Sequence, residues 1–308
     1  MDRFDTGAVT LGGAPFNLSF HLHQLLTALE LGEAVFVSAI GNDEPGDEIR
    51  AKVGQSGMST DFLTTDPIHP TGAALVFTSA GEAGFEILQN VAWDYLRTSP
   101  ALDALALESQ GVVFGSLAQR SLLSRATIQR FVSQVAGPRL YDVNLRRNTT
   151  NSVAGYTPEI ITQSLNLATI VKMNDAEIDE IAAMLGLHSS HQQREPHLWD
   201  LMQQILSTYD LAAITVTRGP LGALLLGQGK RLRLADSTLP AHLVHPVGAG
   251  DSFAAGLLFG IVRGWSLEDA LALAEIISSW VVLHVAATPT LTPDILAKIR
   301  TLAAKASQ

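Results

Sequence analysis

The pattern of hydrophobic and polar residues predicts two kinds of element that alternate along this chain. Short apolar runs, rich in β-branched or aromatic residues and bounded by polar residues or glycine, predict buried strands at 34–40, 111–115, 139–144, 168–174 and 211–217. The longer stretches between them predict helices at 14–31, 44–56, 121–136, 175–185 and 196–208. This alternation predicts an α/β fold with a parallel sheet and helices on both faces.

Two regions depart from the alternation. After two more strands, "GALLLG" and "KRLRLA", helical stretches follow at about 249–263, 267–285 and 293–306. Residues 71–90 read as two strands joined by a glycine-containing turn, which is typical of a hairpin. This hairpin forms either a small β flap that stands off the main sheet or an extra pair of strands at the sheet edge.

Composition narrows the class of protein. The 308 residues are 47% hydrophobic and 16% charged, which predicts a large buried core. The absence of cysteine excludes disulfides and thiolate metal sites and fits a reducing compartment. A formal net charge of -10 argues against nucleic acid and anionic membranes as partners. No apolar run reaches about 18 residues and the first residues lack the features of a signal peptide, so we expect a cytoplasmic protein.

A glycine-rich turn at Gly248, Ala249 and Gly250 leads directly into an apolar helix, with Asp251 at the junction. The N-terminus of a helix carries unpaired N–H groups and about half a positive charge, and glycine lets an anion approach the backbone closely. This turn therefore suits a phosphate, beside which the Asp251 carboxylate can accept a proton from an attacking hydroxyl. The alternative is a tight turn in which the aspartate only caps the helix.

Two other turns that follow predicted strands also suit phosphates. Asn174 and Glu177 face the same way on a first helical turn and can order the water ligands of a magnesium ion that carries phosphates. A capping box is the alternative there. The turn "TRGPLG" can hold nucleotide phosphates with added charge from Arg218, or it is a plain hairpin turn. All three motifs lie at carboxyl ends of strands, where α/β sheets bind their ligands.

Two further segments carry groups that suit a polyol. The glycine pair of "GGAPFN" permits close backbone contact, and the amide of Asn17 can donate and accept hydrogen bonds; the alternative is a glycine turn at a helix start. The segment "YDVNLRRN" places Asp142, Asn144 and Arg146 on one side of a strand and its exit. A bound polyol or phosphate would explain these polar groups, and so would a salt-bridged strand end.

In this order and at these separations, "GGAPFN", "YDVNLR", "NDAE", "TRGPLG" and "VGAGDSFAAG" resemble the PfkB/ribokinase family of sugar kinases across essentially the whole chain. The segments "GGAPFNLSFHL", "VAWDYL" and "FGSLAQRS" are most similar to its bacterial fructokinase-like branch. The resemblance implies one ribokinase-like domain over residues 1–308, with a doubly wound, mostly parallel sheet. A small β lid would come from about 3–11 and 71–96, and its pairing would allow a homodimer.

The resemblance also implies an activity and a role for each motif. ATP would give its γ-phosphoryl group to a sugar hydroxymethyl group, with Asp251 as the base. The anion hole would be the N–H groups of Gly248, Ala249 and Gly250. The sugar-binding residues would be Asp2, Gly12, Gly13, Asn17, Asn144 and Arg146. The nucleotide-binding residues would be Asn174, Glu177, Thr217, Gly219 and Gly222. Mg²⁺ would lie near Asn174 and Glu177, held through waters and phosphates without direct protein ligands.

The chain departs from the family pattern in three places. Family members open with a buried strand before the first lid strand, so here either the start codon is misassigned or the first core strand is missing or truncated, which leaves Asp2 without its support. His245-Pro246 replaces the usual Asp-Thr, and Ala286-Ala287 replaces the usual Gly-Ala. Both replacements lie near the family's cation site and argue against activation by a monovalent cation.

Fructose is the substrate that the resemblance favours. The alternatives are another small polyol, a keto-deoxy sugar acid or a nucleoside, and Arg146 would favour a carboxylated or phosphorylated ligand. A different class is a catalytically impaired, sugar-binding regulatory protein, which the replaced His245-Pro246 and the missing strand suggest. The intact Asp251 argues for catalysis, because a binding protein has no need of a base.

Overall fold

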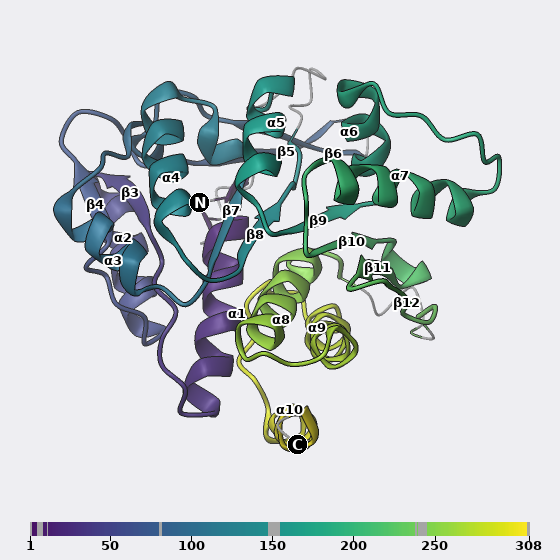
Figure 1. Cartoon of the computed structure of the whole chain (residues 1–308). Helices are drawn as coiled ribbons and strands as arrows, with labels where there is room; N and C mark the ends of the chain where they lie inside the picture. Colours follow the sequence, from purple (N-terminus) through teal and green to yellow (C-terminus); the bar gives the residue numbers. More distant parts are fainter. Residues whose placement is uncertain are drawn as a thin grey trace.

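The fold was analysed in a computed structural model, which describes residues 2–4, 9–10, 12–79, 82–146, 155–237, 239 and 245–306. A six-stranded sheet, in the order β12-β11-β10-β9-β8-β7, forms the centre (Figure 1). Its parallel strands are β7 (Val112–Gly115), β8 (Arg139–Asp142), β9 (Ile170–Asn174) and β10 (Ala213–Thr217). The antiparallel strands β11 (Ala223–Gly227) and β12 (Lys230–Arg233) extend it at one edge.

Helices cover both faces of this sheet. The described helices are α1 (Ala14–Ala28), α2 (Glu44–Gln55), α3 (Pro100–Glu108), α4 (Leu122–Gln134), α5 (Pro158–Leu167), α6 (Glu177–Leu185), α7 (Arg194–Thr208), α8 (Ala249–Val262), α9 (Leu267–Val281) and α10 (Pro293–Ala306). One apolar cluster joins the sheet to α4, α5, α6 and α7, and a second joins its other face to α1, α8 and α9. The predicted doubly wound, mostly parallel α/β fold is confirmed.

Strand residues alternate between the two clusters. In β9, Ile170 packs toward α8 while Val171 packs toward α6 and α7; in β8, Leu140 and Tyr141 divide in the same way. Because side chains in a strand point to the same face at every second position, Asp142 and Lys172 must lie on the face that α8 covers. The polar residues at the strand ends are therefore directed toward the N-terminus of that helix.

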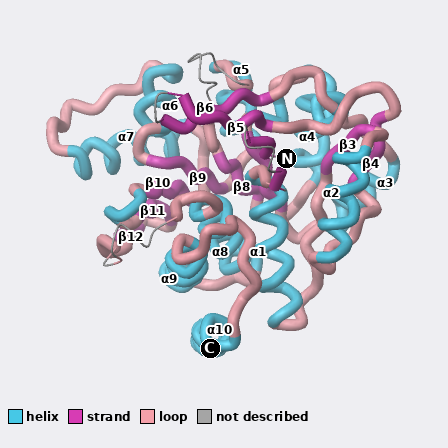
Figure 2. The backbone as a smooth tube through the Cα atoms, turned by 180° about the vertical axis from the view of Figure 1, so that it is seen from behind, coloured by secondary structure: helices cyan, strands magenta, loops and turns pink. Residues whose placement is uncertain are grey.

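The hairpin predicted at 71–90 belongs to a second sheet. Its strands β5 (Ala74–Ser79) and β6 (Glu82–Ile87) pair with β1 (Asp2–Phe4) and β2 (Val9–Thr10) in the order β2-β1-β5-β6. In Figure 2 the hairpin stands apart from β8, β9 and β10, so the flap is confirmed and an extra pair at the edge of the main sheet is wrong. That this sheet closes over a sugar stays a prediction.

The strand predicted at 34–40 is wrong in extent and place. The observed strand is β3 (Ser38–Gly41), which pairs in parallel with β4 (Leu63–Asp66) in a separate two-stranded sheet. Within the described residues, β7 has a strand neighbour on one side only. The prediction that a core strand is missing stays a prediction.

The sequence pattern also did not predict α3, α5 and β4, and it placed the ends of several elements beyond their observed positions. The helix expected to reach residue 285 ends at Val281. The two missed helices nevertheless have clear start signals, because Ser99 and Thr157 cap them by accepting hydrogen bonds from backbone N–H groups, and each is followed by proline. None of the helices in the described part of the chain is long and apolar enough to cross a membrane.

Candidate active site

Three charged side chains meet where α8 begins. Asp142 ends β8, Lys172 lies in β9 opposite it in register, and Asp251 lies in the first turn of α8. The Lys172 Nζ donates to Asp142 Oδ1 at 2.8 Å, and both side chains are buried. A Cβ placed on Gly250 would lie 3.3 Å from this Nζ. The buried ammonium group therefore lies directly beside the glycine-rich turn.

Asp251 is held by a side chain from a distant part of the sequence. Its Oδ2 accepts a hydrogen bond of 2.8 Å from Asn17 Nδ2 in α1, across 234 residues. Burial raises the pKa of Asp251 to about 6; the nearby Asp142 adds to the rise, while Asn17, Lys172 and Arg146 oppose it. A carboxylate whose pKa lies near neutral pH suits a general base. The alternative in which Asp251 only caps the helix has no support, since α8 has no side-chain cap.

The start of α8 requires glycine at Gly248. This residue is the N-cap and has a φ of 84°, in the left-handed region that favours glycine. A Cβ here would also lie 2.8 Å from both the Cβ and the carbonyl oxygen of Ala287. The segment between α9 and α10 thus packs directly against the helix start, where backbone N–H groups can receive an anion.

The "NDAE" motif adopts the geometry of a capping box. Asn174 Oδ1 accepts from the N–H groups of Ala176 and Glu177, both at 2.9 Å, and Glu177 Oε2 accepts from Asn174 N at 2.8 Å. Glu177 Oε1 also accepts from Leu145 N at 2.8 Å. Burial raises the pKa of Glu177, against the effect of the Asn174 N–H. The carboxylate therefore ties the segment with Arg146 to the end of β9, and a role toward Mg²⁺ stays a prediction.

The "TRGPLG" turn is fixed by its own contacts. Gly219 and Gly222 have φ values of 55° and 74°, and a Cβ on Gly222 would lie 2.5 Å from the carbonyl oxygens of the segment after β12. The guanidinium of Arg218 donates to Leu221 O at 2.7 Å and to Glu195 of α7 at 3.1 Å. Arg218 therefore serves the turn and α7 in this structure, which leaves its proposed contribution to phosphate binding without support.

The other predicted residues are Gly12 and Gly13 before α1, Asn144 and Arg146 after β8, Thr217 at the end of β10, and Asp2 in β1. Gly13 is the N-cap of α1, with a φ of 109°, and its carbonyl accepts from Asn17 N at 3.1 Å. Asn144 has a φ of 40°, and Arg146 lies close enough to Asp251 to lower its pKa. The side chain of Asp2 lies outside the described residues.

Sequence analysis did not assign a role to Lys172. The signal that could have identified it was a lysine inside the apolar run "IVKMN", since a buried charge needs a partner.

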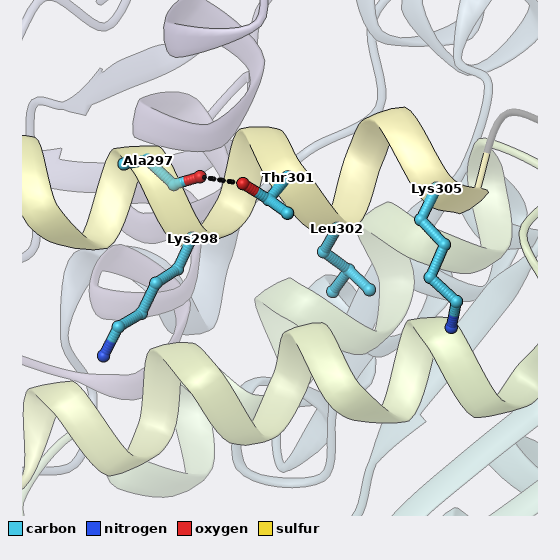
Figure 3. A pocket seen from close by; sticks show the side chains of 5 residues that line it. All are labelled: Ala297, Lys298, Thr301, Leu302 and Lys305. Carbon is cyan, nitrogen blue, oxygen red and sulfur yellow. Dashed lines mark hydrogen bonds between the residues drawn. The ribbon is translucent and has the colours of Figure 1, made fainter.

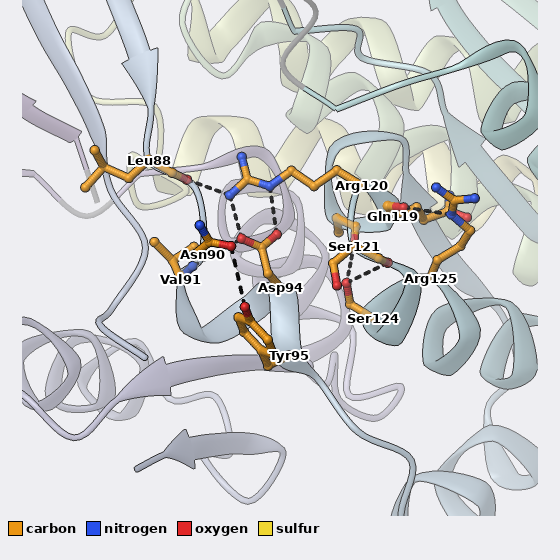
Figure 4. Close-up of polar contacts among 11 residues, drawn as sticks. Leu88, Asn90, Val91, Asp94, Tyr95, Gln119, Arg120, Ser121, Ser124 and Arg125 are labelled. Atoms are coloured by element: carbon orange, nitrogen blue, oxygen red, sulfur yellow. Dashed lines mark hydrogen bonds and ion pairs between the residues drawn. The ribbon is translucent and has the colours of Figure 1, made fainter. Parts of the chain in front are cut away.

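A buried ion pair anchors the flap to the main sheet (Figure 4). Arg120, just after β7, donates to both carboxylate oxygens of Asp94 at 2.7 Å and to Leu88 O at the end of β6. Its guanidinium also lies 4.1 Å from the ring centroid of Trp93. These contacts join "VAWDYL" to "FGSLAQRS", two of the segments that resemble the fructokinase-like branch.

A cavity of about 430 Å³ lies elsewhere, on α10 (Figure 3). Its lining residues are Ala297, Lys298, Thr301, Leu302 and Lys305. None of them belongs to the predicted site, and Lys305 pairs with Asp269 of α9. The candidate active site is therefore the group of charged residues at the strand ends and the start of α8, rather than this cavity.

Sequence comparison gives the family and several named relatives. Residues 1–294 match the pfkB family of carbohydrate kinases. A fructokinase of Salmonella typhimurium is 26% identical over 270 residues, which are 85% of this chain and 80% of that protein. The Pyrococcus horikoshii protein named "Putative sugar kinase PH1459" is 26% identical over 257 residues, covering 82% of this chain and 73% of that protein.

Solved structures show the same fold. The Pyrococcus horikoshii sugar kinase in complex with ATP has a TM-score of 0.75 at 22% identity, covering 98% of this chain and 96% of that one. A double mutant of the Vibrio cholerae fructokinase, with fructose, ADP and potassium bound, has a TM-score of 0.75 at 21% identity and covers 97% and 94%. The chain therefore belongs to the pfkB family of carbohydrate kinases, which are phosphotransferases that act on sugar hydroxyl groups.

Proposed function

We propose that this sugar kinase transfers the γ-phosphoryl group of ATP to a hydroxymethyl group of a small sugar, with fructose as the substrate. The observation that carries the proposal is the buried Asp251 carboxylate in the first turn of α8, held by Asn17 and lying near the Lys172 ammonium. A base, an anion-binding helix start and a buried cation are the parts that phosphoryl transfer requires.

The reaction divides the work among these groups. Asp251 accepts the proton of the sugar hydroxymethyl group as its oxygen attacks the γ-phosphorus. The bond between that phosphorus and the bridging oxygen breaks, and ADP leaves with the electron pair. The N–H groups of Gly248 and Gly250, together with Lys172, stabilise the negative charge on the transferring group. The N–H group of Ala249 can join them only by leaving Pro246 O, to which it donates at 3.2 Å. Positioning and electrostatics supply most of the catalysis in such reactions.

We expect Mg²⁺ to bind at this site together with the phosphates of the nucleotide. In the described parts of the chain, histidines and carboxylates do not gather in threes as a metal site would require. The ion commonly keeps several waters and binds through substrate phosphates, so Asn174 and Glu177 would face it through water. When bound, it neutralises phosphate charge.

Asn17 supports a sugar ligand. Its Oδ1 is buried and accepts no hydrogen bond within the described structure, while its Nδ2 is committed to Asp251. A buried acceptor without a partner is costly, and a sugar hydroxyl placed near the base would satisfy it. Gly12, Gly13 and Asn144 would add contacts from neighbouring segments.

The choice of fructose rests on two supports: the motifs of the fructokinase-like branch and the fructokinases among the relatives. A keto-deoxy sugar acid is the second candidate, and Arg146 favours it. That guanidinium lies near enough to Asp251 to lower its pKa, so it can pair with a substrate carboxylate.

We further propose that potassium does not activate this enzyme, although a potassium ion is bound in the Vibrio cholerae structure. The support is His245-Pro246 and Ala286-Ala287 in place of the usual residues. A cytoplasmic location rests on the absence of cysteine, and a homodimer through the flap rests on family resemblance.

The test is ADP release by the purified chain with Mg-ATP and fructose, 2-keto-3-deoxygluconate, ribose, tagatose, mannose or a nucleoside, each in potassium and in sodium buffer. Fructose should give the highest kcat/KM, with equal rates in the two buffers. Preference for the sugar acid would favour the second candidate. No turnover by the folded chain with any acceptor, together with measurable sugar binding, would indicate a regulatory sugar-binding protein instead.

A further inference from the structure

A histidine in α1 reaches the segment that packs on the anion-binding turn. His21 is 1% exposed, and its Nε2 lies 2.8 Å from the carbonyl oxygen of Ala287, across 266 residues. A carbonyl only accepts hydrogen bonds, so Nε2 carries a proton, while Nδ1 is buried without a hydrogen-bond partner among the described residues. Burial lowers the pKa of His21 to about 4, although the Ala287 contact opposes this. The ring is therefore a fixed donor, not a titrating group, near neutral pH.

His21 lies one helical turn after Asn17, on the same face of α1. Asn17 holds the Asp251 carboxylate, while His21 holds Ala287, whose backbone lies against Gly248. One face of α1 thus reaches both the base and the turn that would bind the phosphoryl group. A backbone hydrogen bond from His245 N to Val282 O, at 2.7 Å, also joins the two segments.

The next contact along α1 offers a comparison. Gln24 donates to Pro289 O at 3.1 Å and accepts from Leu291 N at 2.8 Å. It therefore holds the same segment between α9 and α10, but farther along the chain from Ala287. Loss of Gln24 removes two hydrogen bonds from this segment and leaves the contact at Gly248 in place.

We propose that His21 is a positioning residue for phosphoryl transfer, which holds Ala287 against Gly248 and so keeps the first N–H groups of α8 aimed at the transferring group. The proposal rests on the proposed kinase activity. Those N–H groups matter most when charge develops in the transition state, so their misplacement should lower kcat more than it raises KM for ATP.

The decisive variants are His21→Gln, His21→Asn and Gln24→Leu. The glutamine amide nitrogen has about the reach of the histidine Nε2, whereas the asparagine amide falls short by one methylene group. We expect kcat of the Gln variant within about threefold of wild type and that of the Asn variant about 10- to 100-fold lower, with KM for ATP changed less than about threefold. Gln24→Leu, the control, should lose stability and keep kcat.

Amide hydrogen exchange in residues 245–252 gives a readout that needs no turnover. It should speed up about tenfold or more in His21→Asn and stay near wild type in His21→Gln and Gln24→Leu. If the purified protein shows this exchange pattern but no turnover, the result would support the positioning role of His21 and refute the proposed kinase activity. Wild-type kcat and exchange in a folded His21→Asn, or an equal loss of kcat in Gln24→Leu, would overturn the positioning role.

Discussion

Asp251, the proposed base, is a buried carboxylate with a raised pKa. Burial would keep it protonated, and the Asn17 hydrogen bond and the Lys172 charge oppose this effect. The balance leaves its pKa at about 6, above the usual range for aspartate. The group is therefore mostly ionised at neutral pH but remains basic enough to take a proton from a hydroxyl.

The pH dependence of activity should follow this group. A protonated Asp251 cannot accept a proton, so kcat/KM should rise with pH through about 6 and level off above about pH 7. The measurement is initial ADP release at subsaturating sugar from about pH 5 to about pH 8. A flat profile over this range would contradict the role of Asp251 as the base.

Asp251 should also cost stability at neutral pH. Its folded-state pKa of about 6 lies above the ordinary 3.8, so the folded state binds this proton more tightly and stability falls as pH rises between those values. Asp251→Asn should therefore be more stable than wild type at about pH 7.5, by up to about 3 kcal/mol, and nearly equal at about pH 4. Urea unfolding at both values measures this; a variant less stable at both would refute it.

Variants of Lys172 and Asp142 distinguish a structural from a catalytic role of the Lys172 ammonium group. Lys172→Met leaves a buried carboxylate unpaired, so it should lower the free energy of unfolding by about 3 to 5 kcal/mol. It should also lower kcat by about 100-fold or more through loss of the cation. Adding Asp142→Asn should restore most of the stability but not kcat, as judged by urea unfolding and ADP release. Recovery of kcat in the double variant would show that Lys172 is only structural.

At the scale of elements, the turn motifs and the alternation of strands and helices were predicted more accurately than the ends of the strands. The period of two in "YDVNLRRN" placed Asp142, Asn144 and Arg146 on one side of a strand and its exit; β8 ends at Asp142, which lies on the face that α8 covers. The hairpin expected within 71–90 is observed as β5 and β6. The strand at 34–40 was predicted too long because its apolar run continues through residues that pack without pairing. The contact between Asn17 and Asp251 spans 234 residues, so no local pattern could predict it.

The ion pair between Arg120 and Asp94, which anchors the flap, leads to a prediction about sugar affinity. Arg120→Met removes the hydrogen bonds to Asp94 and Leu88, so the flap should lose its fixed position. We expect KM for the sugar to rise about tenfold with a smaller change in KM for ATP, measured by steady-state kinetics. Arg130→Met is the matched control, because it breaks an exposed Arg–Asp pair with Asp103, which contributes little. Equal effects of the two variants would argue against this role.

At the scale of the whole molecule, two apolar clusters hold the sheet between its helix layers, and the proposed active site lies where α1, α8 and the strand ends converge. Sequence alone predicted the layers, because each buried run is short and bounded. It did not predict how the segment between α9 and α10 returns to Gly248, since that depends on packing between residues far apart in the chain.

The most direct test of the account compares turnover and sugar binding in wild type and Asp251→Asn, with Asp269→Asn on α9 as the control. Loss of the base should lower kcat by about 10²- to 10⁴-fold, while calorimetry shows sugar affinity within a few-fold of wild type. The control should match wild type in both. ADP release at the wild-type rate by a folded Asp251→Asn would contradict the central claim that this carboxylate activates the sugar hydroxyl.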